Sequence, residues 1–495
     1  MTVPMARPAD SRPNVLLIVS DQHRYDCVGA SEDYPVSTPH IDALARSGVW
    51  FDSAFTPIPL CTPARHALIT GQRPETTGGL WNYDLGSRIP ALEPTAYSWA
   101  RELQRGGYRT HYTGKWHVHP DHDPTAFGYD EYVALEDYDR WRETHHPEAR
   151  VRGDWLGGID PVPTESSRTH WLAARTSEFI REAAAAGGPW HARLDLVEPH
   201  LPCLPTEQFA ARVDPNAIPQ WRSFDDPLTD KPYIQRQQLV NWGIEDFTWD
   251  DWAPAVARYY AVIAQMDDAV GSVLRAVAES GAEGNTLVIY TTDHGDMQGS
   301  HRMIDKHYVM YDDVVRVPLV MRWPERITAG SRIDAFAYNM LDLAPTIAAA
   351  TGVSGPPQGH GSDLFAAGSV SEASADVRAR EYVVSTYNGQ QFGLFTQRMI
   401  RTREWKYVWN PTDVDELYDL VGDEREFVNR IDDPACRATV AHLRRALYDQ
   451  LAADGDHMVA NVWMARQLQD GRKLGPSGPD HLRTASARQT REPMA

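Results

Sequence analysis

Two short apolar runs in this sequence each end at an aspartate. Residues 14–20 read Asn-Val-Leu-Leu-Ile-Val-Ser before Asp21, and residues 286–292 read Thr-Leu-Val-Ile-Tyr-Thr-Thr before Asp293. Short, continuous apolar runs are typical of strands buried on both faces of a parallel sheet. Further strand patterns alternate with helical patterns, the strands at 108–113, 191–197 and 317–321 and the helices at 98–105, 256–279 and 343–350. This alternation predicts an α/β fold, a large and mainly parallel sheet flanked by helices.

Polar residues follow four of the predicted strands directly. They are Asp21 and Gln22, Lys115 and His117, His200, and Asp293 and His294. Open α/β sheets bind their ligands at the carboxyl ends of the strands. Lys115 and His117 also lie two residues apart in an extended segment, so both side chains can reach the same place. The sequence therefore predicts that all four groups meet in one site.

The sequence changes character after residue 365. A small, polar stretch at 366–379 precedes strand patterns at 382–387, 392–401 and 405–409 and a helical pattern at 435–451. We predict a catalytic α/β domain over residues 1–365, a smaller α+β domain with an antiparallel sheet over 380–470, and a polar tail over 471–495. Two segments rich in Trp, Asp and Pro, 136–167 and 212–252, lack clear periodicity, and we expect loops that cover the site.

The composition argues against several classes of partner and site. The chain has 495 residues, 42% of them hydrophobic, and its 48 basic and 68 acidic residues give a net charge of −20. So acidic a chain is a poor ligand for nucleic acids and anionic membranes. The four cysteines, Cys27, Cys61, Cys203 and Cys436, lie far apart in the sequence. We therefore expect neither a disulfide framework nor a structural zinc site.

The two ends of the chain bear on location and assembly. The first apolar run, 15–19, is too short for the core of a signal peptide or for a membrane span. We therefore expect a soluble, cytoplasmic protein. A homo-oligomer stays an open alternative, because residues 464–495 either reach a neighbouring subunit or form a loose tail.

The segment Cys61-Thr-Pro-Ala-Arg65 carries the most specific chemical signal. A helical pattern continues through residue 70, so Cys61 is predicted near the positive end of a helix, where an anion gains about 0.3–1 kcal/mol. Alone, this segment also fits a buried structural cysteine beside a surface arginine. The continuation Thr70-Gly-Gln-Arg-Pro74 favours the functional interpretation. The extended motif resembles the signature of the type I, formylglycine-dependent sulfatases of the alkaline phosphatase superfamily.

The resemblance implies a modified nucleophile and a bound metal ion. In that family a formylglycine-generating enzyme oxidises the cysteine, here Cys61, to an aldehyde whose hydrate is the nucleophile. The cation would be held by residue 61 together with Asp21, Gln22, Asp293 and His294. Carboxylate and amide oxygens suit Ca²⁺ best, with Mg²⁺ and Mn²⁺ as alternatives, and the imidazole favours a transition metal. The commonest family set has Asp-Asp and Asp-Asn at these positions; Gln22 and His294 resemble variants that include Mn²⁺-associated phosphonate monoester hydrolases.

The remaining family motifs imply a complete site for a sulfate ester. Arg65 would help activate the nucleophile, Lys115 and Lys306 would bind the sulfate, His117 would contact the hydrated aldehyde, and His200 would protonate the leaving group. Asn82 resembles a family residue near the sulfate, and Tyr83 and Asp84 are candidate contacts to the alcohol. A further family marker is the segment Glu-Leu-Tyr-Asp-Leu at 416–420.

Sulfate monoester hydrolysis of a small molecule is accordingly the predicted function. The first alternative is a phosphonate monoester hydrolase or phosphodiesterase on the same scaffold, which Gln22 and His294 favour and Lys115 and His117 disfavour. A remote alternative is an inactive relative that binds a metal or an anion. The alcohol half of the substrate is left open among a sugar, choline and an aryl group.

Overall fold

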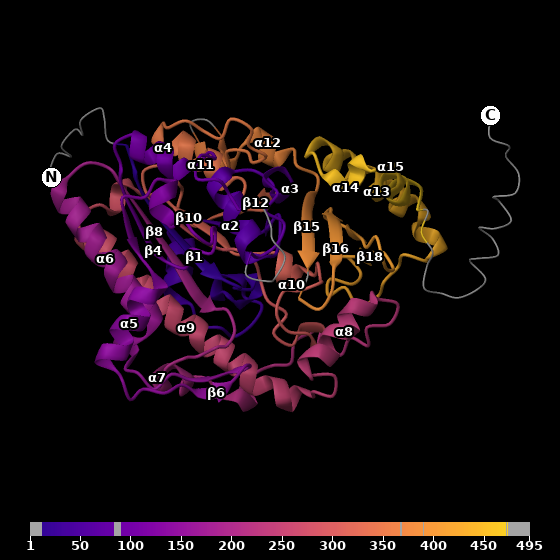
Figure 1. Ribbon diagram of the computed structural model, residues 1–495, viewed down its shortest axis with the longest axis horizontal. Coiled ribbons are helices and arrows are strands. Elements are labelled where there is room, and N and C mark those ends of the chain that lie inside the picture. Colours follow the sequence, from indigo (N-terminus) through magenta and orange to yellow (C-terminus); the bar gives the residue numbers. More distant parts are fainter. Residues whose placement is uncertain (1–11, 84–90, 367–368, 390, 472, 474–495) are drawn as a thin grey trace, which may run out of the picture.

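The computed structural model describes residues 12–83, 91–366, 369–389, 391–471 and 473 (Figure 1). Its largest element is an eight-stranded sheet. From one edge to the other its strands are β11 (Ser331–Ile333), β2 (Val49–Phe51), β10 (Leu319–Arg322), β9 (Thr286–Thr292), β1 (Asn14–Asp21), β8 (Trp190–Pro199), β4 (Arg109–Gly114) and β5 (Glu131–Val133). Among these strands only β10 runs against its neighbours. The predicted α/β fold with a mainly parallel sheet is confirmed.

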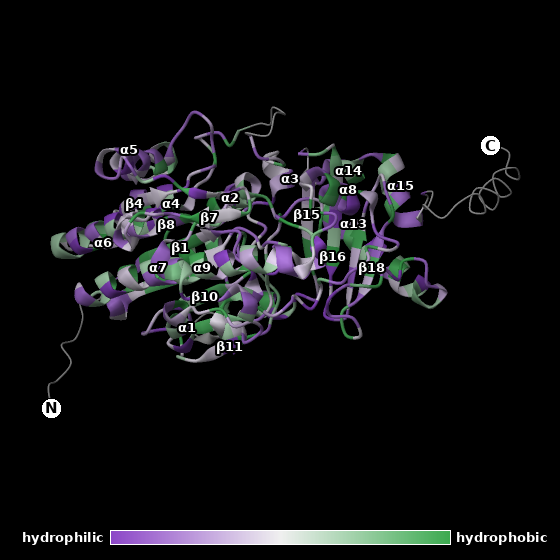
Figure 2. Ribbon diagram, turned by 90° about the horizontal axis from the view of Figure 1, so that it is seen from below, coloured by the Kyte–Doolittle hydropathy of each residue, from purple (hydrophilic) through white to green (hydrophobic). Residues whose placement is uncertain are grey.

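Helices cover both faces of this sheet because side chains alternate along each strand. Val15, Leu17 and Val19 of β1 join one hydrophobic core, and Leu16 and Ile18 join the other. The first core is covered by α2 (Cys61–Thr70), α4 (Trp99–Arg105) and α11 (Leu343–Thr351), and the second by α1 (Pro39–Arg46), α6 (Arg168–Ala186) and α9 (Trp249–Glu279). Hydrophobic residues follow the central strands β1 and β10 in Figure 2. The layered core aligns the carboxyl ends of β1, β9, β8 and β4 along one edge.

A smaller antiparallel sheet lies beside the large one (Figure 1, orange strands). It consists of β15 (Val383–Gly389), β16 (Phe395–Arg401), β17 (Trp405–Trp409) and β18 (Glu416–Asp419) in sequence order. Helix α13 (Arg437–Ala453) packs its apolar face on this sheet, and α14 (His457–Ala460) and α15 (Val462–Asp470) follow. The predicted antiparallel sheet and its helix are thus present, with a fourth strand, β18, that the sequence analysis did not separate.

Each of the two segments predicted as loops contains helical residues. Segment 136–167 holds most of α5 (Leu135–His145) and the hairpin β6 (Arg152–Asp154) and β7 (Gly157–Ile159), and segment 212–252 holds α8 (Tyr233–Trp242) and the start of α9. The prediction was wrong because α5 buries only Tyr138, so its sequence has no apolar period. Pro254 hid the first turns of α9, which Asp251 stabilises by accepting from the Thr248 amide.

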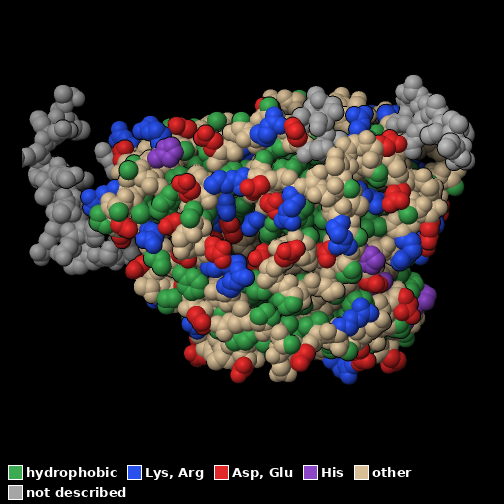
Figure 3. All heavy atoms as spheres, turned by 180° about the vertical axis from the view of Figure 1, so that it is seen from behind, with side chains coloured by type: hydrophobic (Ala, Val, Ile, Leu, Met, Phe, Trp, Pro, Cys, Tyr) green, Lys and Arg blue, Asp and Glu red, His purple; other side chains and the backbone are tan. Residues whose placement is uncertain are grey.

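The other short elements connect these layers. They are α3 (Pro74–Thr77), α7 (Glu207–Ala210), α10 (Asp312–Val315), α12 (Ala375–Arg378), β3 (Ala54–Phe55), β12 (Ala337–Tyr338), β13 (Phe365–Ala366) and β14 (Ser369–Ala373). Across the described helices, none is both long enough and apolar enough to cross a bilayer. Basic and acidic side chains are interspersed on the face shown in Figure 3, which therefore offers no extended basic surface.

Candidate active site

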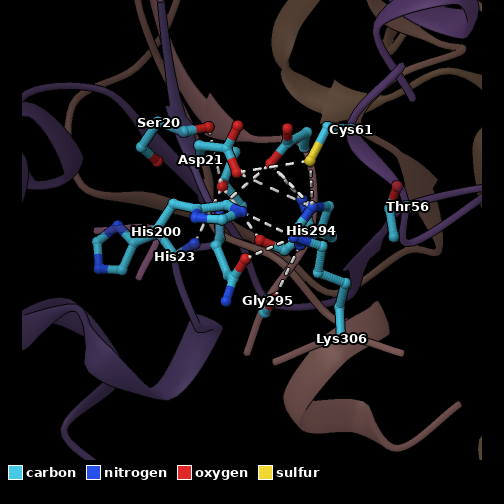
Figure 4. A network of polar contacts seen from close by, with 12 residues as sticks. Ser20, Asp21, His23, Thr56, Cys61, His200, His294, Gly295 and Lys306 are labelled. Carbon is cyan, nitrogen blue, oxygen red and sulfur yellow. Dashed lines mark hydrogen bonds and ion pairs between the residues drawn. The ribbon is translucent and has the colours of Figure 1, made fainter. Parts of the chain in front are cut away.

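Four buried side chains with metal-binding atoms converge where β1 and β9 end (Figure 4). They are Asp21, Cys61, Asp293 and His294, and one ligand atom from each lies within 4.8 Å of all the others. The Cys61 Sγ lies 3.3 Å from His294 Nε2 and 3.8 Å from Asp21 Oδ1. One cluster is therefore formed by the ends of β1 and β9, which are far apart in the sequence, and by the first residue of α2.

Cys61 is held at the amino-terminal end of α2. The helix starts at Cys61, directly after the extended residue Leu60, and Pro63 falls in the first turn, where its missing N–H costs no helical bond. The free Thr62 amide donates to Asn82 Oδ1 over 3.0 Å. Asn82 therefore caps this helix from another segment. The predicted position of Cys61 at the positive end of a helix is confirmed.

The His294 ring has a defined orientation. Its Nδ1 lies 2.9 Å from the Gly295 carbonyl oxygen, and because a carbonyl only accepts, Nδ1 carries the hydrogen. Nε2 then faces Asp293 Oδ1 at 3.7 Å and Asp21 Oδ1 at 4.0 Å. Burial alone would lower the pKa of His294. The negative charges of Asp293 and Cys61 have the larger effect and raise this pKa to about 9. The carboxylates and the thiolate therefore favour a positive charge at Nε2.

Arg65 lies beneath the cluster and links its carboxylates. Its Nη2 lies 3.0 Å from Asp21 Oδ2 and 3.1 Å from Asp293 Oδ2, and its Nη1 lies 2.5 Å from Asp195 Oδ2. Burial and Cys61 raise the pKa of Asp21, but Lys115, His200 and Arg65 outweigh them and hold it low. Burial and Asp21 raise the pKa of Asp293. The Arg65 guanidinium thus faces carboxylates, and Arg65 is absent from the described residues that line the cavity above.

Two lysines, the buried Lys306 and the partly buried Lys115, lie on the cavity side of the cluster. Lys115 Nζ lies 2.6 Å from Asp21 Oδ2. Burial lowers the pKa of Lys115 and of Lys306, but Asp21 and Asp305 respectively raise them more, so both amines carry charge. The pKa of the Cys61 thiol is likewise well below its usual value, because Lys115, Lys306 and His294 outweigh the effect of burial. This part of the site stabilises an anion.

Lys306 also connects His200 to Gln22. Its Nζ lies 2.8 Å from His200 Nε2, 2.9 Å from Gln22 Oε1 and 3.2 Å from Asp305 Oδ1. His200 Nδ1 lies 2.6 Å from the Leu201 carbonyl oxygen, so Nδ1 donates and Nε2 accepts from the lysine. Gln22 Nε2 in turn donates to Asp296 Oδ2 over 2.9 Å. The Gln22 amide oxygen therefore faces the site with one lone pair already engaged.

The cavity above these groups has a volume of about 690 Å³. Cys61, Lys115, His200 and Lys306 line it together with Asn82, Tyr83 and His117. The His117 ring packs edge-on against Tyr83 at 5.0 Å, and His117 is one of the neighbours that lower the pKa of the Cys61 thiol. Asp84 lies outside the described residues. Each of the long segments, 136–167 and 212–252, contributes one lining residue, Glu136 and Trp242.

Asp195 is a functional-site residue that the sequence analysis missed. Besides Arg65, its carboxylate accepts from Arg193 Nε and Nη2, each at 2.7 Å, and from the Tyr112 hydroxyl at 2.8 Å. A signal was present, because Arg193 and Asp195 are charged residues inside the apolar strand pattern 191–197 and buried charges are rare without a partner. Asp296, three residues after Asp293, was also missed, and it accepts a hydrogen bond from Gln22 Nε2.

Comparison with known families identifies the class of enzyme. The sulfatase family model matches residues 13–353, and the model of the N-sulphoglucosamine sulphohydrolase C-terminal region matches residues 299–453. The chain belongs to the sulfatase family of the alkaline phosphatase superfamily, and it is a sulfuric ester hydrolase by that membership. The family resemblance seen in the sequence is confirmed.

Individual relatives span nearly the whole chain. An uncharacterised sulfatase of Escherichia coli K12, YidJ, is 28% identical and covers 92% of this chain and 90% of its own length. An arylsulfatase of Clostridium perfringens is 24% identical and covers 89% of this chain and 94% of its own length. A solved phosphonate monoester hydrolase from Silicibacter pomeroyi is 25% identical, has a TM-score of 0.77, and covers 90% of this chain and 97% of its own.

Proposed function

We propose that this chain hydrolyses a small sulfate monoester with a formylglycine nucleophile made from Cys61. The observation that carries the proposal is the position of Cys61, at the start of α2 and 3.3 Å from His294 Nε2, beside two charged lysines. Its Sγ marks where an oxygen on the same β-carbon would lie. The proposal requires maturation by a formylglycine-generating enzyme. The aldehyde hydrate would supply an oxygen nucleophile that also lets the enzyme release sulfate afterwards.

The donor set fits one divalent cation. Asp21 and Asp293 supply two carboxylates that balance its charge, the residue 61 side chain adjoins them, and the Gln22 oxygen has one lone pair free. His294 offers Nε2 because the Gly295 carbonyl fixes its other nitrogen, the arrangement that metal-binding histidines commonly have. When bound, the cation would polarise the sulfate and lower the pKa of the nucleophile. The imidazole favours Mn²⁺, whereas the oxygen donors also suit the Ca²⁺ expected from the sequence.

The other side chains would bind the sulfate and move protons. Lys115 and Lys306 reach into the cavity and would hold the non-bridging sulfate oxygens and the charge that builds on them. His117 contacts the residue 61 side chain and would accept a proton there. His200 shares a hydrogen bond with the Lys306 ammonium through Nε2, so this pair would deliver a proton to the departing alcohol oxygen.

Phosphonate monoester hydrolysis is the second candidate. The likeness to the Silicibacter pomeroyi phosphonate monoester hydrolase favours it, as do Gln22 and His294. The cationic Lys115 and the adjoining His117 favour the sulfatase, because the resembling hydrolases generally carry uncharged residues at these two positions.

A side-by-side assay separates the two candidates. Protein made together with a formylglycine-generating enzyme would be given 4-nitrophenyl sulfate and an aryl phosphonate monoester, with Cys61→Ala as the control. We expect a higher kcat/KM for the sulfate and no turnover by the control. A clear preference for the phosphonate, or full activity of the control, would contradict the proposal.

A further inference from the structure

The active-site cavity carries opposite charges at its inner and outer ends. The inner end holds the amines of Lys115 and Lys306, which lie 2.6 Å from Asp21 Oδ2 and 3.2 Å from Asp305 Oδ1. The outer end is lined by three exposed acidic residues, Asp121, Asp123 and Glu136. No further lysine or arginine occurs among the described lining residues. Five histidines line the cavity as well, so once a sulfate occupies the two lysines, the other charged side chains of the described lining, with histidine neutral, are carboxylates.

Two of these outer carboxylates are unengaged. Within the described part of the chain, no hydrogen bond or ion pair involves the side chains of Asp121 or Glu136, whereas Asp123 accepts from Thr125 and caps a short turn. Beyond the larger effect of burial, Glu136 and Asp123 both raise the pKa of Tyr132, another lining residue. Their charges therefore act on the same part of the cavity wall.

Aromatic rings complete the outer wall. Trp242, the last residue of α8, lines the cavity and stacks on Trp155 with ring centroids 5.0 Å apart. Its indole nitrogen is enclosed and lacks a hydrogen-bond partner in the described structure. Tyr132 and Trp116 line the cavity as well. Electron-rich ring faces beside carboxylates attract organic cations.

We propose that the alcohol half of the substrate carries a positive charge, so that this enzyme acts on zwitterionic sulfate esters of small ammonium alcohols. The inference rests on the proposed sulfatase function and names its substrate class. Lys115 and Lys306 bind the sulfate end, and Glu136, Asp121 and Trp242 attract the ammonium end. The same outer carboxylates repel the additional negative charges of a polyanionic saccharide.

An isosteric pair of substrates tests this inference. Choline O-sulfate and 3,3-dimethylbutyl sulfate have the same shape and differ by one positive charge, and sulfate release gives kcat/KM for each. With matured, metal-loaded full-length enzyme we expect about a tenfold preference for the cationic ester, the size that ion pairs and a cation–π contact at a partly exposed site provide together. The preference should shrink as salt is added, because exposed charges are screened.

Charge-neutral variants assign the preference to the outer carboxylates. Asp121→Asn combined with Glu136→Gln should remove most of the preference. The control Glu131→Gln, at a half-exposed acid outside the cavity that pairs with Arg109, should keep it. The inference is overturned if kcat/KM is equal for the two esters, or if the double variant keeps the preference. In either case, turnover of 4-nitrophenyl sulfate would still support the proposed function. Failure to hydrolyse any sulfate ester overturns both.

Discussion

The substitution Asp195→Asn tests whether charge balance beneath the active site holds the site together. Asp195 is fully buried and bonds both Arg65 and Arg193. Arg65 keeps Asp21 and Asp293 after the substitution, but Arg193 has no other acidic partner among the ion pairs of the described residues. The variant therefore leaves one guanidinium buried without a counter-charge.

Two independent estimates agree on the cost. Coulomb's law with an effective dielectric constant of about 20 gives about 4 kcal/mol for unit charges about 4 Å apart. Breaking a buried ion pair by removing one partner costs about 3–5 kcal/mol. At about 2 °C per kcal/mol for a large domain, we expect the Tm of Asp195→Asn to fall by about 6–10 °C.

Thermal and denaturant unfolding of three variants would measure this. Removing the orphaned charge as well, in Asp195→Asn/Arg193→Gln, should recover about half of the lost stability, because the double variant no longer buries an unpaired cation. Glu131→Gln, which breaks the half-exposed pair with Arg109, should cost less than about 1 kcal/mol. The reasoning is refuted if Asp195→Asn is as stable as the parent, or if the double variant is no more stable than the single one.

Three further predictions concern catalysis and pH. Cys61→Ser should give one burst of alcohol release and then stall with a sulfated serine, whereas Cys61→Ala should not react; sustained turnover by the serine variant would argue against the aldehyde. His200→Ala should impair alkyl sulfates far more than 4-nitrophenyl sulfate, whose leaving group needs no proton, and equal losses would exclude the leaving-group role. Asp267 accepts from the His40 and Ile41 amides, and burial raises its pKa to about 7. An acid whose pKa is raised by folding stabilises the folded state only while it is protonated. The contribution of Asp267 to the free energy of unfolding is therefore full below about pH 4 and is lost as the pH rises toward 7. The stability of Asp267→Asn relative to the parent should therefore increase by about 2–3 kcal/mol between about pH 5 and about pH 8, and a constant difference in urea unfolding would contradict the assignment.

The metal-binding cluster was predictable because its signals are local. The runs before Asp21 and Asp293 are apolar enough to be strands on their own, and parallel strands place their carboxyl ends at one edge. The motif at Cys61 fixes a helix start directly, through Pro63 and the extended Leu60. These features need no knowledge of distant contacts.

The features that were missed depend on distant contacts. Helix α5 is polar on nearly every side, so its sequence resembles a loop until its neighbours are known. Asp195 gains its role only when Arg65 arrives from a segment far away in the sequence. The role of Asn82 as the cap of α2 and the link between Lys306 and Gln22 are likewise set by packing between segments.

Mass spectrometry of the tryptic peptide that contains Cys61 tests the central claim most directly. The peptide would be taken from protein made with a formylglycine-generating enzyme and, as a control, from protein made without it. The account predicts an aldehyde at position 61 in the first sample, trapped by a hydrazine, together with activity in proportion to its content. A full complement of free thiol in a sample that hydrolyses sulfate esters at its full rate would contradict it.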